Sequence, residues 1–320
     1  MSEKEYGGYL EIEQSKGEEF YSGLHRLNLG RTAAVWLLNN IDHDRVFLPE
    51  YICDTVTESL TAAGFKLVSY RQDEDLKPVW GPEGEPGDRD VFYVVNYNGT
   101  LSDSEIESYR DRYRNVIADN AQAFFNRPVE GVHTLYSVRK FVGAADGAYV
   151  ASTVNASEED LPYDRSAERA LYLAGRLEGS ANEFYSASKA AELAYSNETP
   201  KRMSLFTQNI LRGADYDMIR ERRIANYKTL QGLIGGDNPF NRRETVCPYT
   251  YPFYHKDGIG LRKYLVSKKI YVPTLWSFLL DEAYNGSLEQ DWSANITWLP
   301  IDQRYDEEDM KYIAGVIRGF

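Results

Sequence analysis

The feature that most restricts the fold of this chain is a series of short, wholly apolar runs in its first half. Residues 91–95 form one of these runs, and residues 116–118 form another. Strands that are apolar at every position lie buried on both faces, as in parallel sheets covered by helices. Between the two runs, Ser102 and Glu105 form a capping box that predicts a covering helix over 102–114. The alternation up to about residue 152 therefore predicts an α/β fold with a mostly parallel sheet.

The pattern changes in the second half of the chain. Residues 157–194 are polar but strongly helical. The ranges that follow are predicted as helix, helix, strand, helix, strand and helix: 203–211, 216–234, 246–255, 259–267, 270–272 and 307–317. Mixed helices and strands of this kind are typical of a separate α+β unit. We therefore expect a large α/β domain over residues 1–200 and a smaller α+β domain over residues 201–320.

The composition argues against several classes of protein. The 320-residue chain carries a formal net charge of −13, which argues against a nucleic-acid partner and against an anionic membrane surface. Its two cysteines, Cys53 and Cys247, are too few for a disulfide framework, and its four histidines lack the paired spacing of zinc ligands, so no metal site is expected. The charged residues 1–5, and the lack of a stretch of about 20 apolar residues, predict a soluble, cytoplasmic protein.

Polar side chains follow two of the predicted strands directly. Asp119 comes immediately after the run at 116–118, and Ser137 and Lys140 follow a second run at 134–136. The carboxyl ends of neighbouring strands are the place where open α/β sheets bind their ligands. We therefore expect a carboxylate and an amine to converge there from different strands.

This pair of groups suits one cofactor, pyridoxal 5′-phosphate (PLP). A partly desolvated lysine can form a Schiff base with a carbonyl group, and an opposing carboxylate would keep a pyridine nitrogen protonated. An apolar helix that starts near Thr32, with that residue as its cap, would offer free N–H groups to a phosphate, and Ser137 would add a hydroxyl. An ordinary capped helix, a turn aspartate and a solvated lysine explain the same residues, so the spacing alone leaves both interpretations open.

The motifs as a group resemble those of the DegT/StrS-type sugar aminotransferases. The resemblance runs from about residue 28 to the end of the chain, and its main motifs are Gly30-Arg31-Thr32-Ala33, Leu48-Pro49-Glu50-Tyr51, Asp119-Asn120-Ala121-Gln122-Ala123, Ser137-Val138-Arg139-Lys140 and Asp146-Gly147. It implies fold type I of the PLP-dependent transferases, with a seven-stranded type of large-domain sheet. It also implies a homodimer with both active sites at the subunit interface.

The resemblance assigns roles to three residues of the ring site. Lys140 would hold the cofactor covalently and move the proton between substrate and cofactor. Asp119 would pair with the pyridine nitrogen, and Gln122 would hydrogen-bond the ring hydroxyl. The reaction implied is transfer of an amino group, commonly from glutamate, to a keto sugar attached to a nucleotide, for the synthesis of polysaccharides or secondary metabolites.

By the same resemblance, the phosphate would lie on the backbone of Arg31, Thr32 and Ala33 with the hydroxyl of Ser137. Tyr51 would supply the aromatic ring that many members place over the cofactor, because Cys53 stands at that position here. Leu135 and Pro200 also depart from the family pattern.

Two further functions stay open at this stage. A divergent member could keep the fold as a non-catalytic binding or regulatory protein, and a PLP enzyme of another reaction type would use the same residues. The presence of Lys140 favours amino transfer over the dehydration that members with histidine at this position carry out. Several arginines could meet a pyrophosphate, although arginines on amphipathic helices are more often solvated or salt-bridged: Arg202, Arg222, Arg223, Arg242 and Arg243.

Overall fold

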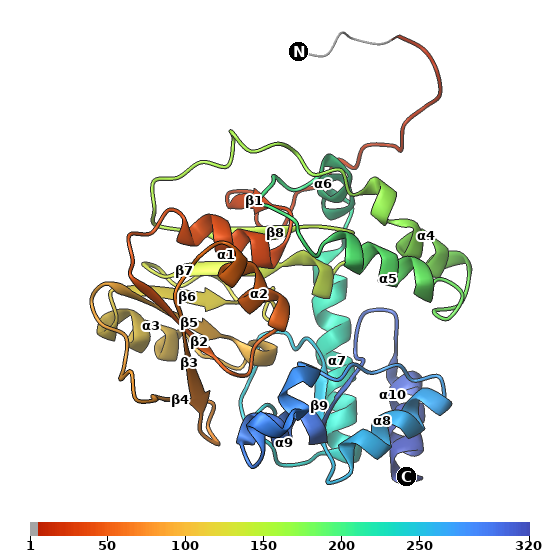
Figure 1. The fold of residues 1–320 in the computed structure, drawn as a ribbon. Coiled ribbons are helices and arrows are strands. Elements are labelled where there is room, and N and C mark those ends of the chain that lie inside the picture. The colour runs from red at the N-terminus through yellow and green to blue at the C-terminus, as the bar shows by residue number, and fades with distance from the viewer. Residues whose placement is uncertain (1–5) are drawn as a thin grey trace.

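The computed structural model describes residues 6–320, and within them an eight-stranded sheet forms the centre of the fold (Figure 1). Its strands are β1 His25–Leu27, β2 Arg45–Pro49, β3 Leu67–Gln72, β4 Pro78–Val79, β5 Asp90–Val95, β6 Asn115–Asp119, β7 His133–Ser137 and β8 Ala148–Ala151. They lie in the order β1-β8-β7-β6-β5-β2-β3-β4. The charged residues 1–5, on which the prediction of a cytoplasmic protein partly rests, lie outside the described residues.

The strand directions confirm a mostly parallel sheet. From β3 through β2, β5 and β6 to β7 all pairings are parallel, and the outer pairings β3–β4, β7–β8 and β8–β1 are antiparallel. All six residues of β5 are buried, as its apolar sequence predicts. The short edge strand β4 interrupts the long connection between β3 and β5.

The helices of the first half cover both faces of this sheet. They are α1 Gly30–Leu38, α2 Asp54–Ala62 and α3 Asp103–Arg112. Alternate residues of β5 separate the two faces: Val91 and Tyr93 pack in one core cluster with α1, whereas Phe92 and Val94 pack in another with α3. The capping box predicted for α3 is present, since Ser102 accepts from the Glu105 amide and Glu105 accepts from the Ser102 amide.

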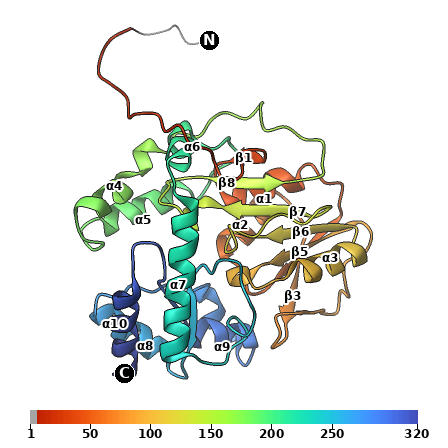
Figure 2. The same cartoon turned by 180° about the vertical axis from the view of Figure 1, so that it is seen from behind.

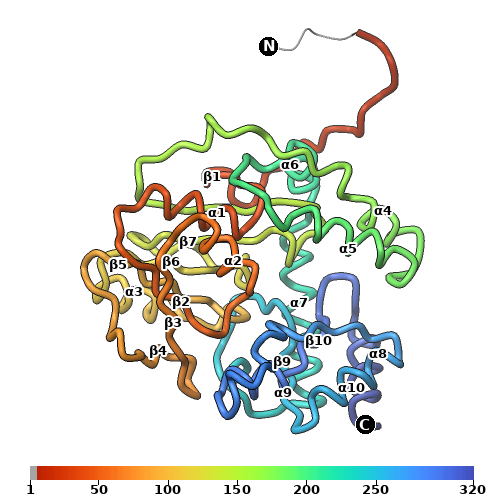
Figure 3. Tube along the Cα trace, in the orientation of Figure 1, coloured from red at the N-terminus to blue at the C-terminus, as the bar shows by residue number. Residues whose placement is uncertain are grey.

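The second half begins with helices and continues as a small mixed unit. Its helices are α4 Leu171–Glu178, α5 Tyr185–Ala194, α6 Leu205–Arg212, α7 Tyr216–Ile234, α8 Gly258–Ser267, α9 Leu288–Asn295 and α10 Glu307–Arg318. An antiparallel pair, β9 Tyr251–Tyr254 and β10 Ile296–Leu299, lies among them. The trace in Figure 3 shows β9, β10, α8, α9 and α10 gathered at one end of the molecule, whereas α4, α5 and α6 lie toward the other end.

Seen from behind, α7 runs as one long helix from α6 down to the C-terminal elements (Figure 2). Its lower part shares a core cluster with α8 and α10 that contains Leu230, Leu261 and Met310. Other C-terminal residues, among them Trp292 and Trp298, pack in the same cluster as α1 and β5. The division of the chain at residue 200 stays a prediction.

Some predicted elements are absent from the structure, and one helix was not predicted. Residues 157–166 form no α-helix, and Pro162 within them lacks the N–H that a helix interior needs. Residues 270–272 form no strand, because the Ile270 amide closes the end of α8 on the Leu265 carbonyl at 2.9 Å. Helix α9 was not predicted, since its sequence is short and mostly polar.

The carboxylate of Asp146 joins the loop before β8 to α6. Asp146 is fully buried. One of its oxygens accepts from the Ser204 amide at 2.8 Å, and the other accepts from the hydroxyls of Ser204, at 2.7 Å, and Thr207. Three donors thus offset the cost of burying this charge.

We expect Asp146→Ala to lower the free energy of unfolding by about 3 kcal/mol, because it leaves the buried donors of Ser204 and Thr207 without an acceptor. Urea denaturation measures this difference. The exposed Asp160→Ala should change it by less than about 0.5 kcal/mol. A loss below about 1 kcal/mol for Asp146→Ala would contradict a structural role for these bonds.

Candidate functional site

Two loops meet at the carboxyl edge of the parallel strands. Asp119 is the last residue of β6, and in the parallel pairing it lies opposite Leu135 of β7. A 3₁₀ turn, Val138–Lys140, follows β7 directly and carries Lys140. The structure therefore places Asp119 and Lys140 after neighbouring strands, as their spacing in the sequence predicts.

Two hydrogen bonds hold the carboxylate of Asp119, a residue that is only 8% exposed. One oxygen accepts from the Tyr93 hydroxyl at 2.7 Å, and the other accepts from the Ala121 amide at 2.8 Å. Burial raises the pKa of Tyr93 well above its ordinary value, and the charge of Asp119 raises it further. The phenol therefore stays protonated and continues to donate to the carboxylate.

A chain of polar contacts links Gln122 to Lys140. The Gln122 side-chain oxygen accepts from the Asn98 amide at 3.1 Å, and the side-chain oxygen of Asn98 accepts from the amides of Tyr249 and Thr250 at 2.8 and 2.9 Å. The Lys140 ammonium lies 5.6 Å from the centre of the Tyr249 ring. Residues from the C-terminal half are thus fastened to the same loops that carry Gln122 and Lys140.

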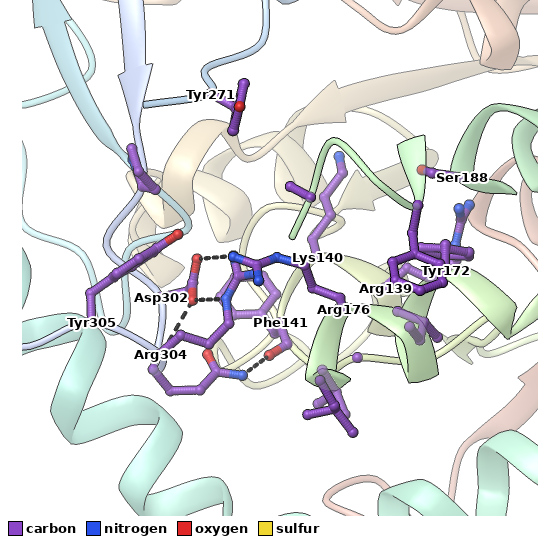
Figure 4. A pocket seen from close by; sticks show the side chains of 18 of the residues that line it. Arg139, Lys140, Phe141, Tyr172, Arg176, Ser188, Tyr271, Asp302, Arg304 and Tyr305 are labelled. Atoms are coloured by element: carbon purple, nitrogen blue, oxygen red, sulfur yellow. Dashed lines mark hydrogen bonds and ion pairs between the residues drawn. The ribbon is translucent and has the colours of Figure 1, made fainter. Parts of the chain in front are cut away.

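Lys140 lines a cavity of about 1060 Å³ between α4, α5 and the C-terminal segment 300–305. Figure 4 shows its side chain extended, with Tyr271 and Tyr305 on one side and Tyr172 and Ser188 on the other. Binding sites for small molecules commonly have volumes of about 300–1,000 Å³. This cavity has room for a cofactor and a substrate together.

The wall of this cavity holds polar atoms that have no partner. Buried nitrogen and oxygen atoms are normally hydrogen-bonded in folded proteins. In the described part of the chain, five residues that line the cavity each carry a buried polar atom without one: Arg139, Arg223, Thr250, Trp298 and Gln303. The wall can therefore bind a polar ligand, and its unpaired donors and acceptors fit a cofactor that carries a phosphate.

The sequence favours a solvated or salt-bridged Arg223 over a pyrophosphate ligand, but in the structure this arginine is buried. Its residue is 3% exposed, and its guanidinium donates to the carbonyls of Tyr249, at 2.8 Å, and Lys140, at 3.2 Å. Burial lowers its pKa. The signal was present in the sequence, because Arg223 falls between Ile219 and Asn226 on the buried face of α7 at helical spacing.

The predicted phosphate residues lie at the start of α1, but Thr32 does not cap it. The N-cap is Leu29, and the Thr32 hydroxyl donates to the Asn28 side-chain oxygen at 2.6 Å and to the Leu29 carbonyl at 3.0 Å. The Ala33 amide donates to the Leu29 carbonyl at 2.8 Å and is already part of the helix. The first-turn amides of Arg31 and Thr32 have no carbonyl four residues earlier within the helix.

Tyr51 and Ser137 differ in their surroundings. The Tyr51 ring is fully buried in the core, 4.2 Å from the Trp276 ring centre and near Phe240. Ser137 is partly exposed at the end of β7 and makes no side-chain cap to the following turn. Within residues 6–320, Lys140 is the one predicted site residue among those that line the cavity. Asp119 and Ser137 lie at strand ends, and Gln122 lies in the turn after β6.

The structure contains no metal cluster in the residues it describes. No group of three or more histidine, cysteine, aspartate or glutamate side chains there could hold a metal ion. The same residues include no helix that is long and apolar enough to span a membrane. Cys53 and Cys247 are free thiols.

Comparison with solved structures finds this fold in aminotransferases. A DegT DnrJ EryC1 StrS aminotransferase from Brucella abortus matches with a TM-score of 0.60 and 16% identity, over 93% of this chain and 85% of its own. DesV from S. venezuelae matches with a TM-score of 0.59 and 19% identity, over 92% and 84%. Spr1654 from Streptococcus pneumoniae, in its PLP form, matches with a TM-score of 0.63 and 13% identity, over 96% and 92%.

No protein-family profile matches the sequence, and no curated protein sequence matches it. At these identities the likeness establishes the fold. The chain therefore has the fold of these aminotransferases, which confirms the prediction of fold type I of the PLP-dependent transferases.

Proposed function

We propose that this chain is a PLP-dependent aminotransferase of the DegT/StrS type, which transfers an amino group from glutamate to a nucleotide-linked keto sugar. The observation that carries the proposal is the position of Lys140. Lys140 lines a large cavity and follows the strand next to the one that ends in Asp119, in a fold that sugar aminotransferases share. Products of this class serve polysaccharide or secondary-metabolite synthesis, and we place the protein in the cytoplasm.

Each proposed ring contact follows from a hydrogen bond in the structure. PLP, when bound, supplies an electron sink for carbanion chemistry. The Asp119 carboxylate, fixed by Tyr93 and Ala121, would hold a proton on the ring nitrogen. The oxygen of the Gln122 amide accepts from Asn98, so its NH₂ group is left to donate to the ring hydroxyl.

Lys140 would bind the cofactor and then act as the base and acid at the reacting carbon of the substrate. The face of the Tyr249 ring lies beside its ammonium and limits the orientation of the side chain. Arg223 donates to the backbone carbonyl of Lys140, so it positions the turn while the amine stays free to move a proton. The arginines that line the cavity, Arg176 and Arg304 among them, support a phosphate-bearing substrate in this acidic chain.

The reaction type is tested by single-turnover spectroscopy. We expect glutamate, added to the PLP-loaded protein, to shift the cofactor absorption to that of the amine form, because the amino group stays on the cofactor until a keto sugar accepts it. Aspartate and alanine serve as competing donors. If no common amino donor converts the cofactor in a folded, loaded protein, amino transfer is the wrong reaction.

A binding or regulatory protein with the same fold is the second candidate function. The observation that favours it concerns the groups predicted to bind the phosphate. The Ala33 amide donates to the Leu29 carbonyl, and the side chains of Arg31 and Arg139 pair with Glu192, so fewer groups are left for a phosphate. Such a protein would bind PLP weakly and would leave the cofactor unchanged when glutamate is added. The same spectroscopic experiment separates the two functions.

We also propose a homodimer, supported by apolar side chains that the single chain leaves exposed. On α4 and α5, Leu177 is 92% exposed and Leu193 is 75% exposed, and on the N-terminal arm Leu10 is 93% exposed. The arm leaves the body near α6 and extends away from it (Figure 1). Exposed apolar groups of this kind commonly mark an interface.

We expect sedimentation velocity to show a dimer, and we expect Leu177→Glu combined with Leu193→Glu to shift it to the monomer, because charged side chains would have to be buried at the contact. Tyr312→Glu on the exposed face of α10 is the matched control and should leave the dimer intact. A double variant that sediments as wild type would place the interface elsewhere.

A further inference from the structure

Two arginines from separate parts of the fold meet on one carboxylate of α5. Arg139 forms an ion pair with one oxygen of Glu192, and the Arg31 guanidinium lies 3.9 Å from the other. The arginine side chains are 14% and 20% exposed, for Arg31 and Arg139 respectively, whereas the Glu192 side chain is 50% exposed. The two cations are therefore built into the body of the protein, and the anion comes from a more exposed helix.

The surroundings of the two arginines suit a phosphate. Arg31 lies in the first turn of α1, where unpaired amides and the helix dipole attract anions. Arg139 lies between Ser137 and Lys140 in sequence, on the turn that follows β7, and α1 packs on β7. The Nε atom of Arg139 is buried and has no partner, so this guanidinium keeps one unused N–H donor.

The geometry of Arg139 connects this cluster with the cavity. Figure 4 shows Arg139 on the side of Tyr172 and Ser188, beside the extended Lys140. Ser188 lies one helical turn before Glu192 and so shares its face of α5. The ion pair therefore sits at the end of the cavity that α4 and α5 close.

The contact between α5 and the body is small. Its apolar part is one cluster of Leu29, Ala191 and Tyr195, with Tyr172 of α4 packed against it. The Tyr195 ring stacks beside Arg139 at 4.6 Å, and its hydroxyl donates to the Ala145 carbonyl. An ion pair between a half-exposed carboxylate and an arginine contributes little free energy. A phosphate would bind the two arginines more strongly, because it carries almost two negative charges and three acceptor oxygens.

We propose that Glu192 is a tethered competitor for the phosphate of the cofactor. Its carboxylate occupies the anion site formed by Arg31 and Arg139, and α5 must release it before the phosphate binds there. The identity of the ligand in this inference rests on the proposed function. The inference adds to that function an anion site formed by two arginines, and a helix, α5, that controls access to the site.

The test compares two ligands that differ in the phosphate alone. Pyridoxal and PLP both react with Lys140, and absorption titration gives the affinity for each. We expect Glu192→Gln to raise the ratio of PLP affinity to pyridoxal affinity about fivefold to tenfold, because a charge that competes with phosphate is lost. Arg139→Gln should lower the ratio by a similar factor. Glu178→Gln, on the exposed end of α4, is the control and should leave it unchanged.

A second readout does not depend on Lys140. Inorganic phosphate should speed amide hydrogen exchange over 185–194 in the wild type, because the helix is released, and the effect should be absent in Glu192→Gln, which already exchanges faster. Protection of α5 by phosphate would overturn the proposal, as would an unchanged affinity ratio in Glu192→Gln. Thermal denaturation of each variant confirms that it is folded.

The failures of the two proposals are distinguishable. A Lys140-dependent cofactor band with an unchanged affinity ratio overturns the role of Glu192 and leaves the enzyme intact. Phosphate-driven release of α5 without any cofactor band supports the anion site and overturns the proposed function. The absence of both effects overturns both.

Discussion

Lys140→Ala is expected to abolish the long-wavelength absorption of the PLP-loaded protein and to slow conversion of the cofactor by glutamate about 10⁴-fold or more. The variant removes the amine that binds the cofactor and the group that moves the substrate proton, and proton transfer by a positioned side chain alone contributes about 10²- to 10⁴-fold. Absorption spectra and single-turnover rates measure the two effects separately.

The fold should survive this substitution, because Arg223 bonds to the backbone carbonyl of Lys140 and not to its side chain. Lys228→Ala, an exposed lysine on α7, is the matched control and should keep both the absorption band and the rate. A Lys140→Ala protein that still converts PLP at the wild-type rate would show that another lysine carries the chemistry.

Asp119→Asn should retain the absorption band but lower the rate of conversion about 10²- to 10⁴-fold, since a neutral amide cannot hold a proton on the ring nitrogen as a carboxylate does. The substitution should lower the free energy of unfolding by about 1–2 kcal/mol. In the wild type each carboxylate oxygen accepts a hydrogen bond, whereas in the variant an NH₂ donor replaces one oxygen and faces another donor. Stopped-flow spectra with glutamate give the rate, and urea denaturation gives the stability.

Tyr93→Phe is the control for this variant. It removes the 2.7 Å hydrogen bond to Asp119 but leaves the carboxylate in place. Its rate should fall far less than that of Asp119→Asn. If the two variants slow the reaction equally, Asp119 acts through its position and not through its charge.

Much of the fold could be predicted because its signals are local. The apolar run at 91–95 became the buried strand β5, and Ser102 with Glu105 became the capping box of α3. The placement of Asp119 and Lys140 followed from one topological rule, that the carboxyl ends of neighbouring strands share an edge.

The remaining features depend on contacts between distant segments. Thr32 is a good cap by type, yet its hydroxyl is taken by Asn28 and Leu29, and the cap falls to Leu29. Tyr51 is enclosed by Trp276, which lies more than two hundred residues later in the chain. The ion pairs of Glu192 likewise join α5 to α1 and to the turn after β7, and a polar helical segment carries no sign of them.

The central claim is that Lys140 binds the cofactor, and chemical trapping tests it directly. The protein would be loaded with PLP, reduced with borohydride to make the bond permanent, digested and analysed by mass spectrometry. The account predicts that the peptide containing Lys140 carries the added mass of a reduced pyridoxyl phosphate. A label on a different lysine, or no label on a folded and loaded protein, would contradict it.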